Sequence, residues 1–202
     1  CNTASAKALR SIQVNDLPYL DPDRRVLGVI RPTVEQIGKL SRNQHVGLLA
    51  TAGTVLSQSY DIELTKLYPD IHVSSVACLM WVPVVENNEF QSAGADYFVQ
   101  KYIHQLLAKD PDIDTIILGC THYPLLMEKI RQHCPSHITL VPQGQYVAES
   151  LADYLLRHGE IARVCTRGGT CQYLTTESPD KFDECASVFL REHVEARRIV
   201  LE

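Results

Sequence analysis

The stretch 114-DTIILGCTHYPLL-126 joins a short apolar run to a polar turn and a proline. A run of this kind is typical of a strand that is buried on both faces of a parallel sheet. Gly119 permits close approach of the backbone, and Pro124 suits the first turn of a helix. The stretch therefore predicts a central strand that ends at Cys120 and leads into a helix near 124–133.

Short apolar runs alternate with amphipathic segments on both sides of this stretch. The alternation indicates an α/β fold with parallel sheets, in which ligands sit beyond the carboxyl ends of the strands. A helix is expected over 89–109, with an apolar stripe that includes Tyr97, Val99 and Ile103. The other expected strands are 25–30, 45–50, 71–78, 137–141, a run at 171–176 and a closing strand at 197–202, and the other expected helices are 32–42, 145–158 and 179–191, with a loop and helix over 51–67.

Composition and charge exclude several classes of protein. Of the 202 residues 45% are hydrophobic and 21% are charged, as in an ordinary soluble protein with one large or two small domains. The net charge of −5 without clustered Lys and Arg argues against a nucleic-acid surface. The longest apolar stretch, 73–85, holds Pro83 and falls short of the roughly 20 residues that cross a bilayer.

The seven cysteines form neither a disulfide framework nor a zinc motif. Their number is odd, and the chain contains no C-x-x-C spacing. Reduced thiols in a cytoplasmic protein are expected, and most of the seven are expected to be buried.

Two of the thiols stand at predicted helix N-termini. "GCTHYP" (119–124) places Cys120, Thr121 and His122 at a strand-to-helix junction, where backbone N–H groups favour a thiolate. "CNTAS" (1–5) places Cys1 before a helical run, among the cap residues Asn2 and Thr3. One such motif is explained equally well by a buried cysteine and a capping residue, but two in one chain indicate working thiols.

Two further strand ends carry polar candidates. Thr51 and Thr54, in "ATAGTVLSQSY" (50–60), follow the expected strand 45–50, and their hydroxyls can cradle a carboxylate or simply cap a helix. Glu86, in "WVPVVENNE" (81–89), follows a mostly apolar run, where a glutamate is usually a loop residue or a cap.

Two thiols on opposite sides of one small carboxylate ligand suit the inversion of a carbon stereocentre. One base removes the proton and the other delivers a proton to the opposite face, so the site has to stabilise a strongly anionic transition state. A cysteine pKa near ~8.5 can be tuned for this task by helix ends and by an imidazole or carboxylate neighbour.

At these residues the sequence resembles the glutamate racemases of the aspartate/glutamate racemase family. The segments "CNTAS", "ATAGTVLSQSY", "VPVVE" and "GCTHYPLL" look like the family's signature segments in the family's order, and the resemblance extends over all 202 residues. It implies a cytoplasmic, homodimeric enzyme without cofactor or metal, which makes D-glutamate for peptidoglycan from L-glutamate. An aspartate racemase is the close alternative.

The resemblance also implies roles for individual residues. Cys1 and Cys120 match the two acid/base cysteines, which deprotonate D-glutamate and L-glutamate respectively. His122 and Glu86 match auxiliary polar groups near the second cysteine. Of these two, His122 is assigned to the catalytic residues, together with Cys1 and Cys120. The residues that match substrate-binding groups are Asn2, Thr3, Thr51, Thr54 and Thr121, with Glu86 beside them.

The fold implied by the resemblance is two similar three-layer α/β domains with mainly parallel sheets and the active site in the cleft between them. Residues 1–26 plus 135–202 would form the first domain and 27–134 the second. In the family about seventy residues precede the first cysteine, so the first domain is expected to be incomplete here. An inactive fragment is therefore the alternative from another class.

Overall fold

The computed structural model describes residues 1–201. These residues belong to two compact units, Cys1–Tyr154 and Leu155–Glu202. Every predicted functional residue lies in the first unit.

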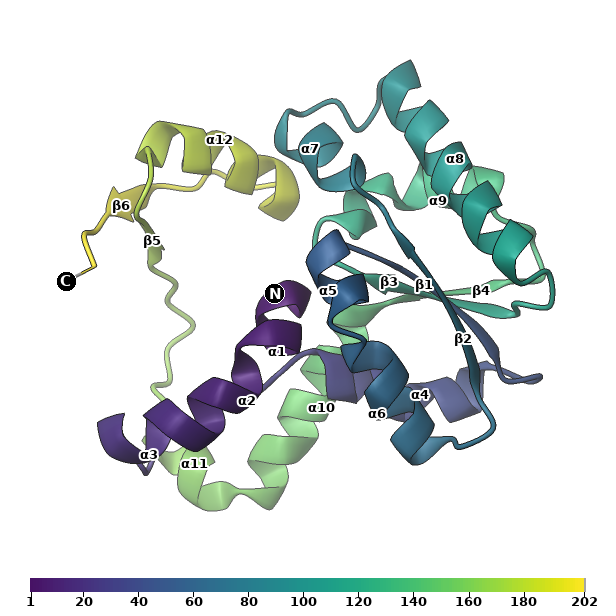
Figure 1. The fold of residues 1–202 in the computed structure, drawn as a ribbon. Coiled ribbons are helices and arrows are strands. Elements are labelled where there is room, and N and C mark those ends of the chain that lie inside the picture. The colour runs from purple at the N-terminus through teal and green to yellow at the C-terminus, as the bar shows by residue number, and fades with distance from the viewer. Residues whose placement is uncertain (202) are drawn as a thin grey trace. The chain divides into compact units, whose positions relative to one another are not determined.

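The first unit is built on a four-stranded sheet in the order β2-β1-β3-β4 (Figure 1). The strands are β1 (His45–Ala50), β2 (His72–Ala77), β3 (Thr115–Gly119) and β4 (Thr139–Pro142), and all neighbours are parallel. All five residues of β3 are buried, as its apolar sequence predicts. The predicted α/β class with a parallel sheet is confirmed.

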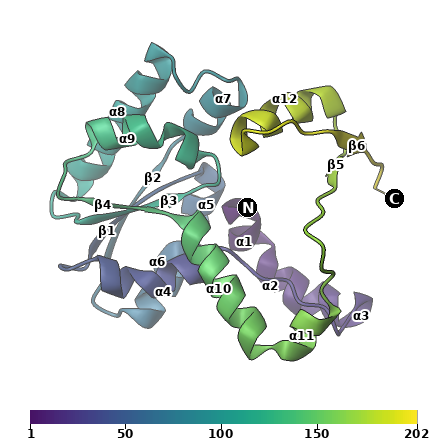
Figure 2. The same cartoon turned by 180° about the vertical axis from the view of Figure 1, so that it is seen from behind.

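Helices cover both faces of this sheet, which gives the first unit three layers (Figures 1 and 2). On one face, Val46, Leu48 and Ala50 of β1 pack in a core with α4 (Ile30–Leu40) and α6 (Ser59–Leu67). The other face carries α8 (Ala93–Lys109) and α9 (Met127–His133). At Gly47 a β-carbon would lie only 2.7 Å from Leu106 of α8, so this position requires the smallest residue.

An aromatic cluster supports the turn that follows β3. Trp81 begins α7 (Trp81–Glu86), a helix that the sequence did not predict. Its ring packs edge-on against Tyr123, at 4.6 Å between centroids, and against Tyr102, at 6.1 Å. Trp81 and Tyr123 are fully buried. Because Tyr123 opens the 3₁₀ helix η2 (Tyr123–Leu126), this packing fixes the backbone directly after Cys120.

The chain before α4 is helical and then irregular. Its helices are α1 (Asn2–Lys7), α2 (Leu9–Ser11), the π-helical turn η1 (Ile12–Asp16) and α3 (Leu17–Leu20). The predicted strand at 25–30 is wrong, since none of the described strands pairs with this segment. Side chains bond its backbone instead: Gln13 Nε2 donates to the Val26 carbonyl at 2.6 Å, and the Val29 N–H donates to Ser5 Oγ at 3.2 Å.

The other boundaries follow the sequence with smaller corrections. The helix predicted at 89–109 begins at Ala93, because the Ser92 hydroxyl caps it by accepting from the Ala95 N–H at 3.1 Å. In its predicted stripe Val99 and Ile103 are buried, whereas Tyr97 is exposed. The loop and helix expected over 51–67 are the helices α5 (Ala52–Leu56) and α6. The helix expected at 145–158 is α10 (Gln143–Arg157).

The second unit is a small β-α-β arrangement. The parallel pair β5 (Tyr173–Thr175) and β6 (Ala196–Arg198) is joined through α12 (Pro179–Leu190), with α11 (Gly159–Val164) upstream. Asp183 of α12 accepts a hydrogen bond from the Ala196 N–H at 2.8 Å, which ties the helix to β6. The predicted closing strand lies one residue earlier and is shorter than expected.

Two general expectations have different outcomes. All seven cysteines are free, but only Cys78 and Cys120 are buried, so the expectation that most of them are core residues is wrong. Within residues 1–201, no helix has both the length and the apolar character needed to cross a bilayer.

Candidate active site

A polar or thiol side chain directly follows every strand of the four-stranded sheet. Thr51, Cys78, Cys120 and Gln143 come after β1, β2, β3 and β4. The register pairs Ala50 with both Ala77 and Gly119, so the residues that follow them lie along one edge. This is the carboxyl edge of a parallel sheet, where the sequence predicts the site.

Cys120 heads a relay of three polar side chains at this edge. Its Sγ lies 3.7 Å from His122 Nδ1, and His122 Nε2 is hydrogen-bonded to Glu86 Oε1. Thr121 Oγ1 lies 3.5 Å from the same His122 Nδ1. Glu86 is the last residue of α7, so the aromatic packing of that helix also places the carboxylate.

The relay favours the charged form of the imidazole. The pKa of His122 is raised above its ordinary value, first by the hydrogen bond with Cys120 and then by Glu86, and partial burial opposes the shift. A protonated His122 puts a positive charge and an N–H donor beside Cys120 Sγ, which stabilises a thiolate there. The geometry therefore suits a cysteine that alternates between thiol and thiolate.

A cluster of hydroxyls lies at the end of β1. Thr3 Oγ1 is 2.9 Å from Thr51 Oγ1 and 3.3 Å from Thr54 Oγ1, and the last two atoms are 3.1 Å apart. Thr51 also caps α5 by accepting from the Thr54 N–H at 3.3 Å, which confirms the helix-cap interpretation of this pair. At Gly53 a β-carbon would lie 3.0 Å from the Thr3 methyl group, so this glycine lets α1 approach α5.

The first residues of the chain bring α1 to the same edge. Cys1 is the N-cap of α1 and is exposed, and its carbonyl accepts from the Ser5 N–H at 3.0 Å. Asn2 is buried, and its Nδ2 donates to Tyr60 OH at 2.7 Å and to Gln143 Oε1 at 2.5 Å. The structure thus groups Asn2 and Thr3 with the ends of β1 and β4, and groups Thr121, His122 and Glu86 with Cys120.

Sequence reasoning missed Tyr60 and Gln143 as site residues. Tyr60 is fully buried, and burial raises its pKa while its bonds to Gln143 and Asn2 oppose the shift. Gln143 is also buried, and its partner Asn2 lies 141 positions away in the sequence. No local pattern signals a contact over that separation.

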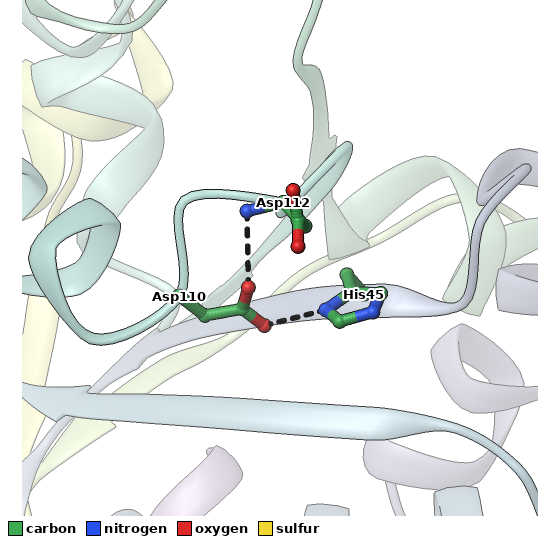
Figure 3. Close-up of side chains that lie close together, drawn as sticks. All are labelled: His45, Asp110 and Asp112. Atoms are coloured by element: carbon green, nitrogen blue, oxygen red, sulfur yellow. Dashed lines mark hydrogen bonds and ion pairs between the residues drawn. The ribbon is translucent and has the colours of Figure 1, made fainter.

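A second cluster lies at the opposite edge of the sheet (Figure 3). His45, the first residue of β1, has Nδ1 2.9 Å from Asp110 Oδ2, and the Asp112 N–H donates to Asp110 Oδ1 at 3.0 Å. The possible ligand atoms of His45, Asp110 and Asp112 lie within 4.8 Å of one another. The contact between His45 and Asp110 joins the loop before β3 to the start of β1, and none of the predicted site residues belongs to this cluster.

The family of the chain follows from comparison with known proteins. The family model described as Asp/Glu/Hydantoin racemase matches residues 23–150. A glutamate racemase from Enterococcus faecalis is 38% identical over 207 aligned positions, which cover 100% of this chain and 71% of the relative. The chain belongs to the Asp/Glu/hydantoin racemase family. Another member, a glutamate racemase from Levilactobacillus brevis, is 37% identical over 190 positions.

Solved structures of the family share the fold. A glutamate racemase isoform from Bacillus anthracis superimposes with a TM-score of 0.86 at 28% identity, covering 100% of this chain and 72% of that one. A glutamate racemase from Francisella tularensis, solved in complex with D-glutamate, gives 0.80 at 26% identity and covers 71% of that chain. The alignment with the Levilactobacillus brevis racemase covers 94% of this chain and 66% of the relative, so this chain spans about two thirds of the relative's length.

Proposed function

We propose that this chain carries the two-cysteine site of a glutamate racemase, which interconverts L- and D-glutamate without a cofactor. The observation that carries the proposal is the relay from Cys120 through His122 to Glu86, which lies within the residues that match the racemase family model. Proteins named glutamate racemase at 37–38% identity supply the substrate class.

The proposed chemistry moves one proton at a time. The Cys120 thiolate takes the α-proton of L-glutamate, the electron pair stays on the α-carbon, and the Cys1 thiol gives its proton to the opposite face. D-glutamate leaves, with Cys120 now a thiol and Cys1 a thiolate, and the reverse reaction restores the first state. His122 assists by donating to the Cys120 thiolate, because its raised pKa keeps it protonated over a wider pH range.

The hydroxyl cluster is proposed to hold the substrate. Thr3, Thr51 and Thr54 present three hydroxyls within 3.3 Å of one another, and each can donate to a carboxylate oxygen. Thr121 and Asn2 are proposed to complete the contacts to the amino and carboxylate groups. Donors fixed in advance stabilise the anionic transition state without reorganising when it forms.

The test follows the α-proton rather than the product alone. The 202-residue chain, and the same chain preceded by the N-terminal part of the Enterococcus faecalis relative, are incubated with L-glutamate or L-aspartate in D₂O. Optical rotation reports inversion, and proton NMR reports loss of the α-proton signal. We expect glutamate to exchange and invert in EDTA and without added pyridoxal phosphate.

Each outcome decides between the candidates. Faster turnover of L-aspartate than of L-glutamate would identify aspartate, and not glutamate, as the substrate. Activity only in the extended form would show that the 202-residue chain alone is an inactive fragment. No exchange with either amino acid in either form would overturn the proposal.

Four wider properties belong to the same proposal. The enzyme would act in the bacterial cytoplasm and supply D-glutamate for peptidoglycan. It would be a homodimer. Light scattering of the purified protein tests this by measuring its molar mass in solution. Its domains would be 1–26 with 135–202, and 27–134.

A further inference from the structure

Gln143 lies at the centre of a buried amide network. It follows β4 and opens α10, and it is 8% exposed. Its Oε1 accepts from Asn2 Nδ2 at 2.5 Å, and its Nε2 donates to Thr33 Oγ1 at 3.1 Å and to Tyr60 OH. The network thereby joins the first residue of α1 to the end of β4 and to the helices α4 and α6.

The bonds of the network fix which way each amide points. Thr33 gives its hydroxyl proton to the Val29 carbonyl at 3.4 Å, so its oxygen is the acceptor toward Gln143. Gln143 therefore turns its NH₂ group to Thr33 and Tyr60, and its carbonyl to Asn2. Asn2 in turn directs its NH₂ group at Gln143 and Tyr60, while its Oδ1 has no hydrogen-bond partner among residues 1–201.

The buried side chain of Asn2 attaches the start of α1 to the end of β4 and to α6. Asn2 is 3% exposed, whereas Cys1 beside it is exposed. Both Nδ2 protons of Asn2 are used by the network, so the side chain cannot turn without breaking two hydrogen bonds. Whatever holds Asn2 also holds the backbone that carries the Cys1 thiol.

We propose that Gln143 is a positioning residue, whose amide holds Asn2 and through it places Cys1 at the sheet edge that bears Cys120. The proposal rests on the proposed function for the role of Cys1, but the placement of α1 can be measured without activity. Gln143 acts through Asn2 and is not a group that handles the proton.

The first experiment measures placement by amide hydrogen exchange on the 202-residue chain. In Gln143→Met we expect the Ser5 amide, which bonds to the Cys1 carbonyl, to exchange roughly tenfold faster, relative to the Ile117 amide in the core. Gln145→Met is the matched control, because Gln145 lies on the same helix, is exposed, and donates to the exposed Glu149. Unchanged Ser5 exchange, or equal acceleration at Ile117, would overturn the proposal.

The second experiment distinguishes an effect on Cys1 from an effect on Cys120. It uses whichever form of the protein, the 202-residue chain or its extended form, turns over glutamate. In D₂O, Gln143→Met should slow α-proton exchange of D-glutamate, the enantiomer assigned to Cys1, by about ten- to a hundredfold, because small displacements of a catalytic group have effects of this size. Exchange of L-glutamate through Cys120 should change less than about twofold by the same reasoning. Equal losses for both enantiomers would contradict a role in placing Cys1.

A double variant tests the route of the effect. If Gln143 acts through Asn2, then Gln143→Met adds nothing to D-glutamate exchange once Asn2→Ala is present. Additive losses would contradict the proposal. If the unaltered protein exchanges neither enantiomer, the proposed function fails, and the Ser5 measurement still decides the placement.

Gln143→Glu supplies a pH-dependent rescue. A protonated Glu can donate to Tyr60 and accept from Asn2 as the amide does, whereas an ionised Glu only accepts. Because burial raises a carboxyl pKa, the D-glutamate exchange rate of the variant, divided by that of the unaltered protein, should rise as the pH falls. A ratio that does not depend on pH would contradict the amide geometry.

Discussion

Replacing Gly119 by alanine tests how the sheet places Cys120. Gly119 is the last residue of β3, and it pairs with Ala50 of β1. A β-carbon built at this position lies 3.0 Å from Leu48 Cδ1, 3.1 Å from Ala50 Cβ and 3.4 Å from the Leu49 carbonyl oxygen. Carbon atoms pack best at about 3.5–4.0 Å, so the new methyl group overlaps two neighbours.

The cost of the substitution depends on which neighbour can yield. The Leu48 methyl group can move by a small rotation of its side chain, but Ala50 Cβ and the Leu49 carbonyl move only with the backbone of β1. Overpacking a well-filled core costs about 1–3 kcal/mol, and we expect Gly119→Ala to lie in this range. Because Cys120 is the next residue, its Sγ should also shift relative to His122.

Urea denaturation measures the cost. With a slope of about 1–3 kcal/mol per molar, the expected loss lowers the midpoint by roughly 1 M at an unchanged slope. Gly144→Ala is the matched control, because nothing lies within 4 Å of its β-carbon position and the residue is helical. That change should be neutral or stabilise by up to about 1 kcal/mol. A midpoint for Gly119→Ala at or above that of the unaltered protein would refute the packing argument.

Three further substitutions test the site. Cys120→Ser should abolish racemisation, since a serine hydroxyl is far less acidic than a thiol; substantial retained turnover would remove Cys120 from the mechanism. Glu86→Gln should lower the pKa of His122, followed by NMR titration of its ring protons. A histidine whose pKa is raised in the folded state stabilises the fold at low pH, and this stabilisation is lost as the pH rises through that pKa. Glu86→Gln should therefore be less stable than the unaltered protein at pH values below the His122 pKa of the unaltered protein. An unchanged His122 titration would count against the relay. Tyr60→Phe removes the acceptor of two buried N–H groups and should cost about 1–3 kcal/mol by the same urea assay; an unchanged midpoint would contradict the network.

The sheet could be predicted because its signals are local. The runs at 45–50 and 114–120 are almost wholly apolar and are bounded by polar residues, and they form β1 and β3. The run at 25–30 looks similar, but a strand needs a neighbour to bond its N–H and C=O groups. Here Gln13 and Ser5 bond those groups instead, and no local pattern predicts that.

The site was predictable to the extent that its residues are close in sequence. Cys120 and His122 are two positions apart at a strand end, so their contact follows from the turn between them. The partnership of His122 with Glu86, 36 positions away, followed only from resemblance to the family. The bond between Asn2 and Gln143 depends on the packing of α1, α4, α6 and α10 together, and it became visible only in the folded chain.

The two thiols are therefore held by different kinds of interaction. Cys120 continues directly from a fully buried strand, and the ring of Tyr123 packed on Trp81 fixes the turn beyond it. Cys1 begins a six-residue helix that is docked largely through polar side chains, which include Asn2 and Thr3. A hydrogen bond of this kind contributes about 0.5–1.5 kcal/mol, whereas displacing Cys120 requires the core itself to open. We therefore expect the Cys1 side to be the less rigid half of the proposed site, and we expect Gln143, which bonds three partners, to contribute to holding it.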